Sequence, residues 1–220
     1  MNDRDAPHSA RVLPVFLIVD TSGSMAEHGK IECLNLAIRD MISSLFDLSG
    51  NDVEVGVAVI TFGGSDASVH LPLSVGSIVD WVDLVACGAT PLGAALLLLA
   101  KTLETPTFVS NTSYSPTTIL VSDGLPTDEY EVPLRQFLAS DGGQDAVRIA
   151  VRIGPESDQS VLESFTGTKS AVFSASDAAV IEKLFRHLTD VVRSRARVAG
   201  LEAFNLPSSF EFVDLSDSRF

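Results

Sequence analysis

The chain has few cysteines and no long apolar run, and each shortage excludes a class of protein. Its 220 residues include only two cysteines, Cys33 and Cys87. Because both lie in apolar surroundings, we expect buried thiols in a reducing compartment rather than a disulfide. The longest apolar stretch, Leu92 to Ala100, is too short to cross a bilayer and predicts a buried helix instead.

Positive charge is also scarce. The chain has 15 lysines and arginines against 29 acidic residues, so its net charge is −14. We therefore expect no binding to nucleic acid, because the chain could not neutralise a row of phosphates, and no binding to an anionic membrane surface. Residues 1–11 are polar and lack the apolar core of a signal peptide, which favours a cytoplasmic location.

Apolar, strand-like stretches alternate with helix-like stretches along most of the chain. The stretches that predict strands are Val12–Val19, Val53–Phe62, Val69–Leu71, Thr118–Val121, Ala146–Ile153 and Ala171–Phe173. Several are almost wholly apolar, as expected for central strands of a parallel sheet covered on both faces. The segments with helical periodicity are Ile31–Leu45, Leu92–Leu103 and Val180–Val192. We predict an α/β fold with a doubly wound, mostly parallel central sheet and helices on both faces.

The predicted domain covers residues 11–196, and the two ends fall outside it. We expect residues 1–10 to form a flexible arm and residues 197–220 to form a C-terminal tail. Residues 210–215 alternate between apolar and polar side chains. This segment could pack on its own domain or add an edge strand to a partner.

The segment that follows the first predicted strand carries a cluster of oxygen-bearing side chains. Asp20, Ser22 and Ser24 are spaced two residues apart, and Gly23 allows the turn to bend. The three side chains can converge above the end of the strand. Their oxygens are hard ligands, which suit Mg²⁺ rather than a thiophilic metal.

Two further loops carry oxygen ligands in the same kind of position. Asp123 directly follows an apolar strand, and Thr90 precedes the buried helix, with Pro91 at a favoured first-turn position. In an open α/β sheet, ligands bind beyond the carboxyl ends of the strands, where the strand order reverses. We therefore expect Thr90 and Asp123 to complete the site begun by the first turn.

The pattern Asp20-x-Ser22-x-Ser24, together with Thr90 and Asp123, resembles the von Willebrand factor A (VWA) domain. The resemblance extends over about residues 13–192. It implies that these five residues form a complete metal-ion-dependent adhesion site (MIDAS). The resemblance implies Mg²⁺ as the bound ion, with Mn²⁺ or Ca²⁺ as alternatives.

Within that family, the chain is most similar to bacterial TerY-like proteins linked to tellurium resistance. The similarity is carried by stretches such as Leu13–Met25 and Asp123–Asp128. That subfamily is associated with a Ser/Thr protein kinase and a PP2C-type phosphatase. The resemblance therefore implies a role in a phosphorylation-linked stress or defence system.

A count of charges indicates how such a site would work. The two carboxylates neutralise the charge of Mg²⁺. Together with the three hydroxyls they still leave it short of six ligands, so water must fill the remaining positions. A partner's Asp or Glu can replace one water and add a third negative charge. We therefore predict a metal-dependent protein–protein interaction module and no enzymatic activity.

Other functions stay open at the level of sequence. A Mg²⁺-dependent hydrolase is one, although no phosphate-binding loop or nucleophile elbow is present. A VWA adaptor of an ATPase-linked chaperone or chelatase is another, and adhesion is a third. The tail acids Glu211, Asp214 and Asp217 could also supply the missing ligand to a second copy, which would make the chain self-associate.

Several nearby polar residues have ordinary structural explanations. Glu27, His28 and Lys30 are expected at the rim of the site or on the solvated surface. Asp128 is expected to be an outer-shell acceptor or the cap of a helix from residue 129. Ser176 or Asp177 is expected to cap the last helix. The three histidines without a partner at zinc spacing are interpreted as structural; they are His8, His70 and His187.

Overall fold

A computed structural model of the chain describes residues 11–47, 53–76, 80–105, 113–154 and 158–200. In this part of the chain, a six-stranded sheet has the order β3-β2-β1-β4-β5-β6. Its strands are β1 (Arg11–Asp20), β2 (Val53–Gly63), β3 (Asp66–Val75), β4 (Thr117–Ser122), β5 (Val147–Ile153) and β6 (Val172–Ala175). Neighbouring strands are parallel except that the edge strand β3 runs antiparallel to β2.

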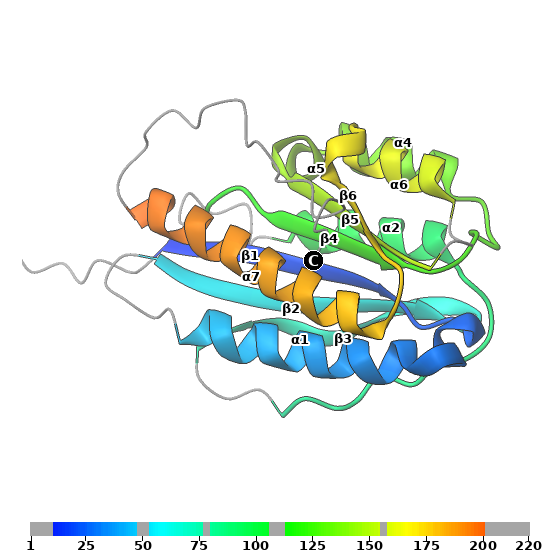
Figure 1. The fold of residues 1–220 in the computed structure, drawn as a ribbon. Helices are drawn as coiled ribbons and strands as arrows, with labels where there is room; N and C mark the ends of the chain where they lie inside the picture. Colours follow the sequence, from blue (N-terminus) through cyan, green and yellow to red (C-terminus); the bar gives the residue numbers. More distant parts are fainter. Residues whose placement is uncertain (1–10, 48–52, 77–79, 106–112, 155–157, 201–220) are drawn as a thin grey trace, which may run out of the picture.

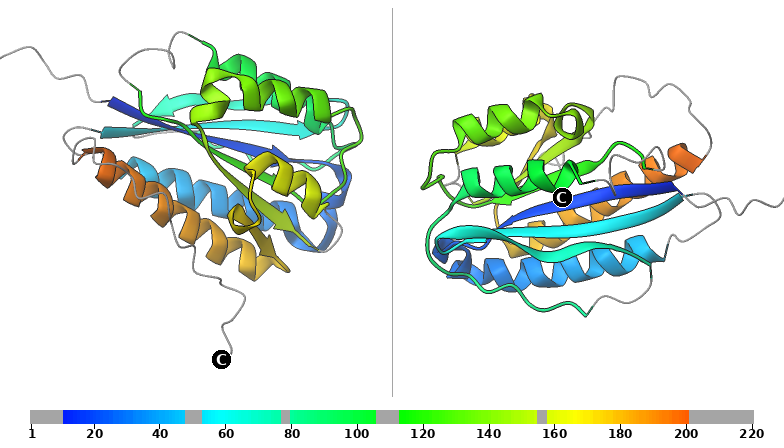
Figure 2. Two further views of the ribbon diagram at one scale, coloured as in Figure 1. Left: turned by 90° about the horizontal axis from the view of Figure 1, so that it is seen from above. Right: turned by 180° about the vertical axis from the view of Figure 1, so that it is seen from behind.

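Helices cover both faces of the sheet (Figures 1 and 2). One face carries α1 (Lys30–Phe46) and α7 (Ala178–Gly200), which contact each other along their lengths. The other face carries α2 (Leu92–Leu103), α4 (Glu131–Ala139), α5 (Asp141–Asp145) and α6 (Gln159–Thr166). Two 3-10 segments, η1 (Gly23–Gly29) and η2 (Lys169–Ala171), complete the described elements. The predicted fold class is confirmed.

The central strands are apolar on both sides because two separate cores lie against them. In β1, Leu17 and Val19 belong to the core under α1 and α7. Phe16 and Ile18, between and beside them, belong to the core under α2, α4 and α6. Successive side chains of a strand point to opposite faces, so a strand buried on both faces must be apolar throughout.

The predicted strands and the three predicted helices are all present, with boundaries that differ by a few residues. Asp177 caps α7, because its Oδ1 accepts hydrogen bonds from the backbone N–H of Ala179 and of Val180. Helix α7 ends at Gly200, so residues 197–200 of the predicted tail are helical. The predictions for residues 1–10 and 210–215, for His8 and for the tail acids lie outside the described residues.

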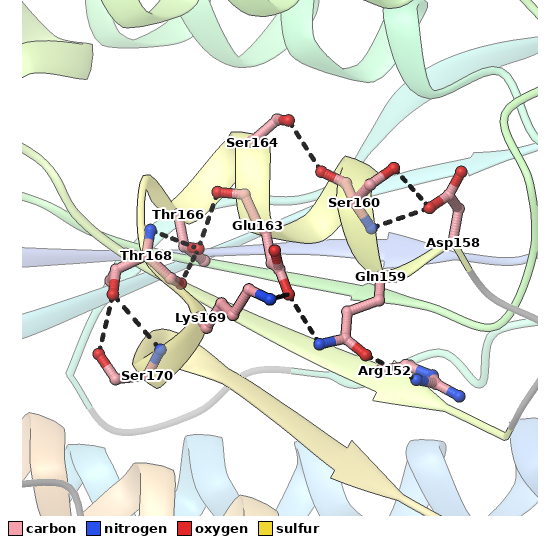
Figure 3. Close-up of polar contacts among 10 residues, drawn as sticks. All are labelled: Arg152, Asp158, Gln159, Ser160, Glu163, Ser164, Thr166, Thr168, Lys169 and Ser170. Carbon is pink, nitrogen blue, oxygen red and sulfur yellow. Dashed lines mark hydrogen bonds and ion pairs between the residues drawn. The ribbon is translucent and has the colours of Figure 1, made fainter.

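Helices α5 and α6 were not predicted, since each is too short for its periodicity to stand out, and α4 was expected only as a helix from residue 129, two residues before its start at Glu131. Figure 3 shows the caps of α6 and η2. Asp158 Oδ1 accepts from the N–H of Ser160 at 2.8 Å, and Thr168 Oγ1 accepts from the N–H of Ser170 at 3.4 Å. Lys169 Nζ lies 3.9 Å from Glu163 Oε1. Asp158 caps the start of α6, and Gly167, with φ 77°, follows its end, so both boundaries have a signal in the local sequence.

The prediction of two buried thiols was wrong. Cys33 is half-buried on α1, and Cys87 is exposed. Cys87 lies in an irregular segment where its main chain, rather than its side chain, is fixed. Its N–H donates to Thr21 O at 2.7 Å, and its carbonyl accepts from Gly64 N at 2.8 Å. Among the described residues both cysteines are free thiols.

The irregular segment of residues 80–91 is held against α1 by one buried side chain. Asn35 Nδ2 donates to Leu84 O at 3.0 Å, and Asn35 Oδ1 accepts from Leu84 N at 2.7 Å. Both residues are buried. The pair of hydrogen bonds satisfies the backbone of Leu84, which has no strand neighbour to do so. None of the described helices meets the length and hydropathy needed to span a membrane.

We expect Asn35→Ala to lower the free energy of unfolding by about 1–3 kcal/mol, because it leaves a buried N–H and a buried carbonyl unpaired. For a chain of this size, each kcal/mol corresponds to a fall in Tm of about 2–4 °C. Thermal unfolding followed by circular dichroism measures the change.

The matched control is Leu36→Ala, at the next residue of α1, whose side chain is 55% exposed. This substitution should change Tm by much less, since little buried contact is lost. Equal shifts for the two variants would show that Asn35 does not hold the segment.

Candidate metal centre

The candidate site lies at the carboxyl end of β1, where the strand order reverses. From β1 the chain passes through η1 to α1 on one face of the sheet, whereas it reaches β4 from α2 on the other face (Figure 1). Val19 of β1 is paired with Val121 of β4, so the next residues, Asp20 and Ser122, lie side by side. This switch point is the usual ligand site of doubly wound sheets.

Asp20 is fully buried and its carboxylate is held at both oxygens. Oδ1 accepts from the N–H of Ser22 at 2.8 Å, and Oδ2 accepts from Ser122 Oγ at 2.6 Å. Burial raises the pKa of the Asp20 carboxyl above its ordinary value. The hydrogen bonds from Ser122 and Ser22 lower this pKa in part, and the negative charge of Asp123 raises it further.

Hydroxyl groups connect the first turn with the loop after β4. Ser22 Oγ lies 3.1 Å from Ser24 Oγ, and Ser24 Oγ donates to Asp123 Oδ1 at 2.7 Å. Ser22 and Asp123 are each 2% exposed, whereas Ser24 is half-buried. Ser24 and Asp123 are 99 residues apart in the chain, so only the parallel pairing of β1 with β4 brings them together.

Thr90 approaches the same place from the other face of the sheet. Thr90 N donates to Thr127 Oγ1 at 3.0 Å, and Thr127 N donates to Thr90 O at 3.0 Å. A methyl group on Gly124 would lie 3.5 Å from Thr90 Oγ1 and 3.9 Å from Ser24 Oγ. The absence of a side chain at Gly124 therefore leaves room between these two hydroxyls.

Asp128 has a different role from either of those predicted. Its Oδ1 accepts from Gly93 N at 2.9 Å and its Oδ2 accepts from Ala94 N at 3.0 Å. It thus caps the start of α2 from a distant part of the chain, and α4 begins only at Glu131. The cap and the Thr127 contacts together fix the loop after β4 against the segment that carries Thr90.

Lys30 lies inside the site, where sequence reasoning had assigned it to the rim or the surface. Its Nζ is 2.7 Å from Asp123 Oδ2 and donates to Ser24 O at 3.4 Å. The side chain of Lys30 is only 18% exposed and that of Asp123 is not exposed at all. Glu27 and His28 are exposed, as expected for the rim.

The donor set fits a hard divalent cation. Asp20, Ser22, Ser24, Thr90 and Asp123 present only oxygen atoms, two of them in carboxylates. Among the described residues no group of three or more His, Cys, Asp or Glu side chains could hold a metal ion. Binding here would therefore depend on the hydroxyls and on water. His70 and His187 pack against Trp81 and Phe173, respectively, in agreement with a structural role.

A comparison with known protein families decides the identity of the domain. A sequence model of the von Willebrand factor type A domain matches residues 15–187, which is most of the chain. The chain belongs to the VWA family. This is a family of metal-dependent protein-interaction modules. No curated protein matches the sequence.

Solved VWA structures have the same fold at low sequence identity. Proximal thread matrix protein 1 from the mussel byssus, with a zinc-occupied MIDAS motif, is 16% identical with a TM-score of 0.62, over 85% of this chain and 49% of that one. The von Willebrand factor type A structure from Catenulispora acidiphila is 20% identical with a TM-score of 0.58, and the match covers 82% of this chain and 42% of that one. The ArnB paralog VWA2 from Sulfolobus acidocaldarius is 16% identical with a TM-score of 0.61, and the match covers 83% of this chain and 45% of that one. The chain thus covers less than half the length of each of these structures.

We expect Asp20→Asn to raise the Tm of the metal-free chain. The folded chain holds the Asp20 proton more tightly than the unfolded chain, because burial raises the pKa of this carboxyl above its ordinary value of 3.8. Stability therefore falls as the pH rises from that ordinary value through the raised one, and it stays lower above. The neutral amide removes this loss.

Melting curves in EDTA between about pH 4 and about pH 7 test the prediction, and the advantage of Asp20→Asn over the wild type should grow with pH. Asp40→Asn, an exposed position on α1, is the control and should show no such trend. An advantage that is constant or shrinks with pH would contradict it.

Proposed function

We propose that this VWA domain binds a divalent cation through Asp20, Ser22, Ser24, Thr90 and Asp123, and that a partner protein completes the coordination with an Asp or Glu side chain. The single observation that carries the proposal is the convergence of two buried carboxylates and hydroxyl groups at the switch point between β1 and β4. Burying two like charges so close together is costly, and Lys30 offsets only one of them, so one negative charge remains for a bound cation to neutralise.

The chain's own residues would bind and orient, and they would carry out no reaction. The serines and Asp20 are held by the turn after β1, Thr90 by its contacts with Thr127, and Asp123 by Ser24. Such fixed donors need little rearrangement when a ligand arrives. A bound divalent cation supplies a positive centre that a carboxylate can reach.

The nature of the cation is also a proposal. Oxygen-only donors with water favour Mg²⁺, and Mn²⁺ or Ca²⁺ suit the same ligands. The zinc-occupied MIDAS motif of the mussel protein supports a divalent ion at this position of the fold.

The partner is proposed from the sequence. The TerY-like stretches at residues 13–25 and 123–128 support a role beside a Ser/Thr kinase and a PP2C-type phosphatase, in a tellurium-resistance or related stress response. The domain would then act as an adaptor that assembles phosphorylation enzymes in a metal-dependent way.

We expect Asp20→Ala or Asp123→Ala to weaken partner binding by more than about a hundredfold, because each removes an anionic ligand of the cation. The tagged wild-type chain is used to capture its partner from the native host in Mg²⁺, and the complex is challenged with EDTA. Affinity for the captured partner is then measured for each variant.

Asp40→Ala is the matched control, since it removes the same charge from an exposed position on α1. It should bind as the wild type does. If either site variant bound as tightly as the wild type, and EDTA had no effect, the proposal would be wrong. Capture of an AAA-type ATPase in place of a kinase or phosphatase would instead support the chaperone or chelatase adaptor.

A further inference from the structure

The ammonium group of Lys30 already places a positive charge beside a buried carboxylate, as a bound metal ion would. It bonds to Asp123 Oδ2 at 2.7 Å, while Ser24 Oγ bonds to the other oxygen of that carboxylate. Both oxygens of Asp123 thus have donors before any ion binds. One of the two buried negative charges is neutralised from within the chain.

The position of Lys30 in α1 gives no helical reason for a cation. Lys30 is the first residue of the helix, after Gly29. A positive charge in the first turn is unfavourable, because the helix dipole makes that end positive. His28, two residues before it, has φ 55°, which is uncommon for a residue other than glycine. The contact with Asp123 compensates for these costs, which points to a role in the site.

We propose that Lys30 is an internal competitor of the metal ion, which lowers the affinity of the free domain for a divalent cation and raises the affinity of the metal-loaded domain for a carboxylate. This inference rests on the proposed metal site and concerns how that site is tuned. Lys30 is not itself a ligand in this proposal; it acts by the positive charge that it places beside Asp123.

A charge count explains the two opposite effects. With Lys30, the site carries −1 when metal-free, because two carboxylates oppose one ammonium. A divalent ion changes the charge to +1, and a partner carboxylate then returns it to zero. Without Lys30 the same three states carry −2, zero and −1. Lys30 thus disfavours the metal-only state and makes it attractive to an anion.

The consequence is a dependence of metal occupancy on the partner. Repulsion between Lys30 and the cation is offset in the full complex by attraction between Lys30 and the carboxylate. The metal-only state has no such compensation. A free domain would therefore stay largely metal-free at cation concentrations at which the complex is loaded, and the two ligands would enter together.

Mn²⁺ titration of the purified full chain, followed by electron paramagnetic resonance of the free ion, tests the first effect. We expect Lys30→Met to tighten Mn²⁺ binding about tenfold, since it removes a cation that lies beside the metal ligands. Acetate titration of the Mn²⁺-loaded chains tests the second effect, and acetate should bind severalfold more weakly to Lys30→Met than to the wild type.

Two controls separate charge from structure. Lys30→Arg keeps the charge and should stay within about threefold of the wild type in both titrations. Lys101→Met removes the same charge from an exposed position in the last turn of α2 and should change neither. If Lys30→Met does not fold, Lys30→Gln is measured in its place against the same expectation.

The outcomes distinguish this inference from the metal site on which it rests. Mn²⁺ binding that is unchanged or weaker in Lys30→Met, with a wild type that binds, would overturn the role of Lys30 alone. A merely structural role for Lys30 would weaken both ligands together, rather than shift them in opposite directions. No Mn²⁺ binding by either the wild type or Lys30→Met would overturn the metal site and, with it, the role of Lys30.

Discussion

The buried carboxylate of Asp20 at the end of the central strand is the constraint on which the rest of the site depends. A charge in that position must be paired or hydrogen-bonded, because water cannot reach it. Ser122 of the neighbouring strand and the N–H of Ser22 meet this need. The same contacts align the turn after β1 with the end of β4. The hydrogen bonds that the Asp20 carboxylate needs therefore fix two loops relative to each other.

The remaining loops are joined to this pair mainly by backbone contacts. Gly23 N donates to Gly88 O at 3.0 Å, and Thr21 O accepts from Cys87 N at 2.7 Å. Asp128 and Thr127 hold the segment around Thr90. Rigid loops on a doubly wound sheet favour binding without large rearrangement, in keeping with a family of protein-interaction modules.

The net charge of the site depends on three groups, the carboxylates of Asp20 and Asp123 and the ammonium of Lys30. Two buried carboxylates would repel each other strongly, and Lys30 neutralises one of them. The chain as a whole carries −14, so the positive charge of the largely buried Lys30 is a local exception to the overall balance. We expect the proposed binding of a metal ion and of an acidic partner to depend on this local balance more than on the overall charge.

The sequence by itself determined the succession of strands and main helices along the chain, the resemblance to the family, and the oxygen side chains expected at one edge of the sheet; the order of the strands within the sheet came from the structure. These depend on local patterns: apolar runs, helical spacing, and short motifs directly after a strand. Only the tertiary structure decided the roles of Lys30 and Asp128 and the exposure of Cys87. Lys30 and Asp123 are 93 residues apart, and Asp128 caps a helix about 35 residues before it. A side chain's local sequence does not reveal a partner so far away, because that pairing exists only once the strands have found their neighbours.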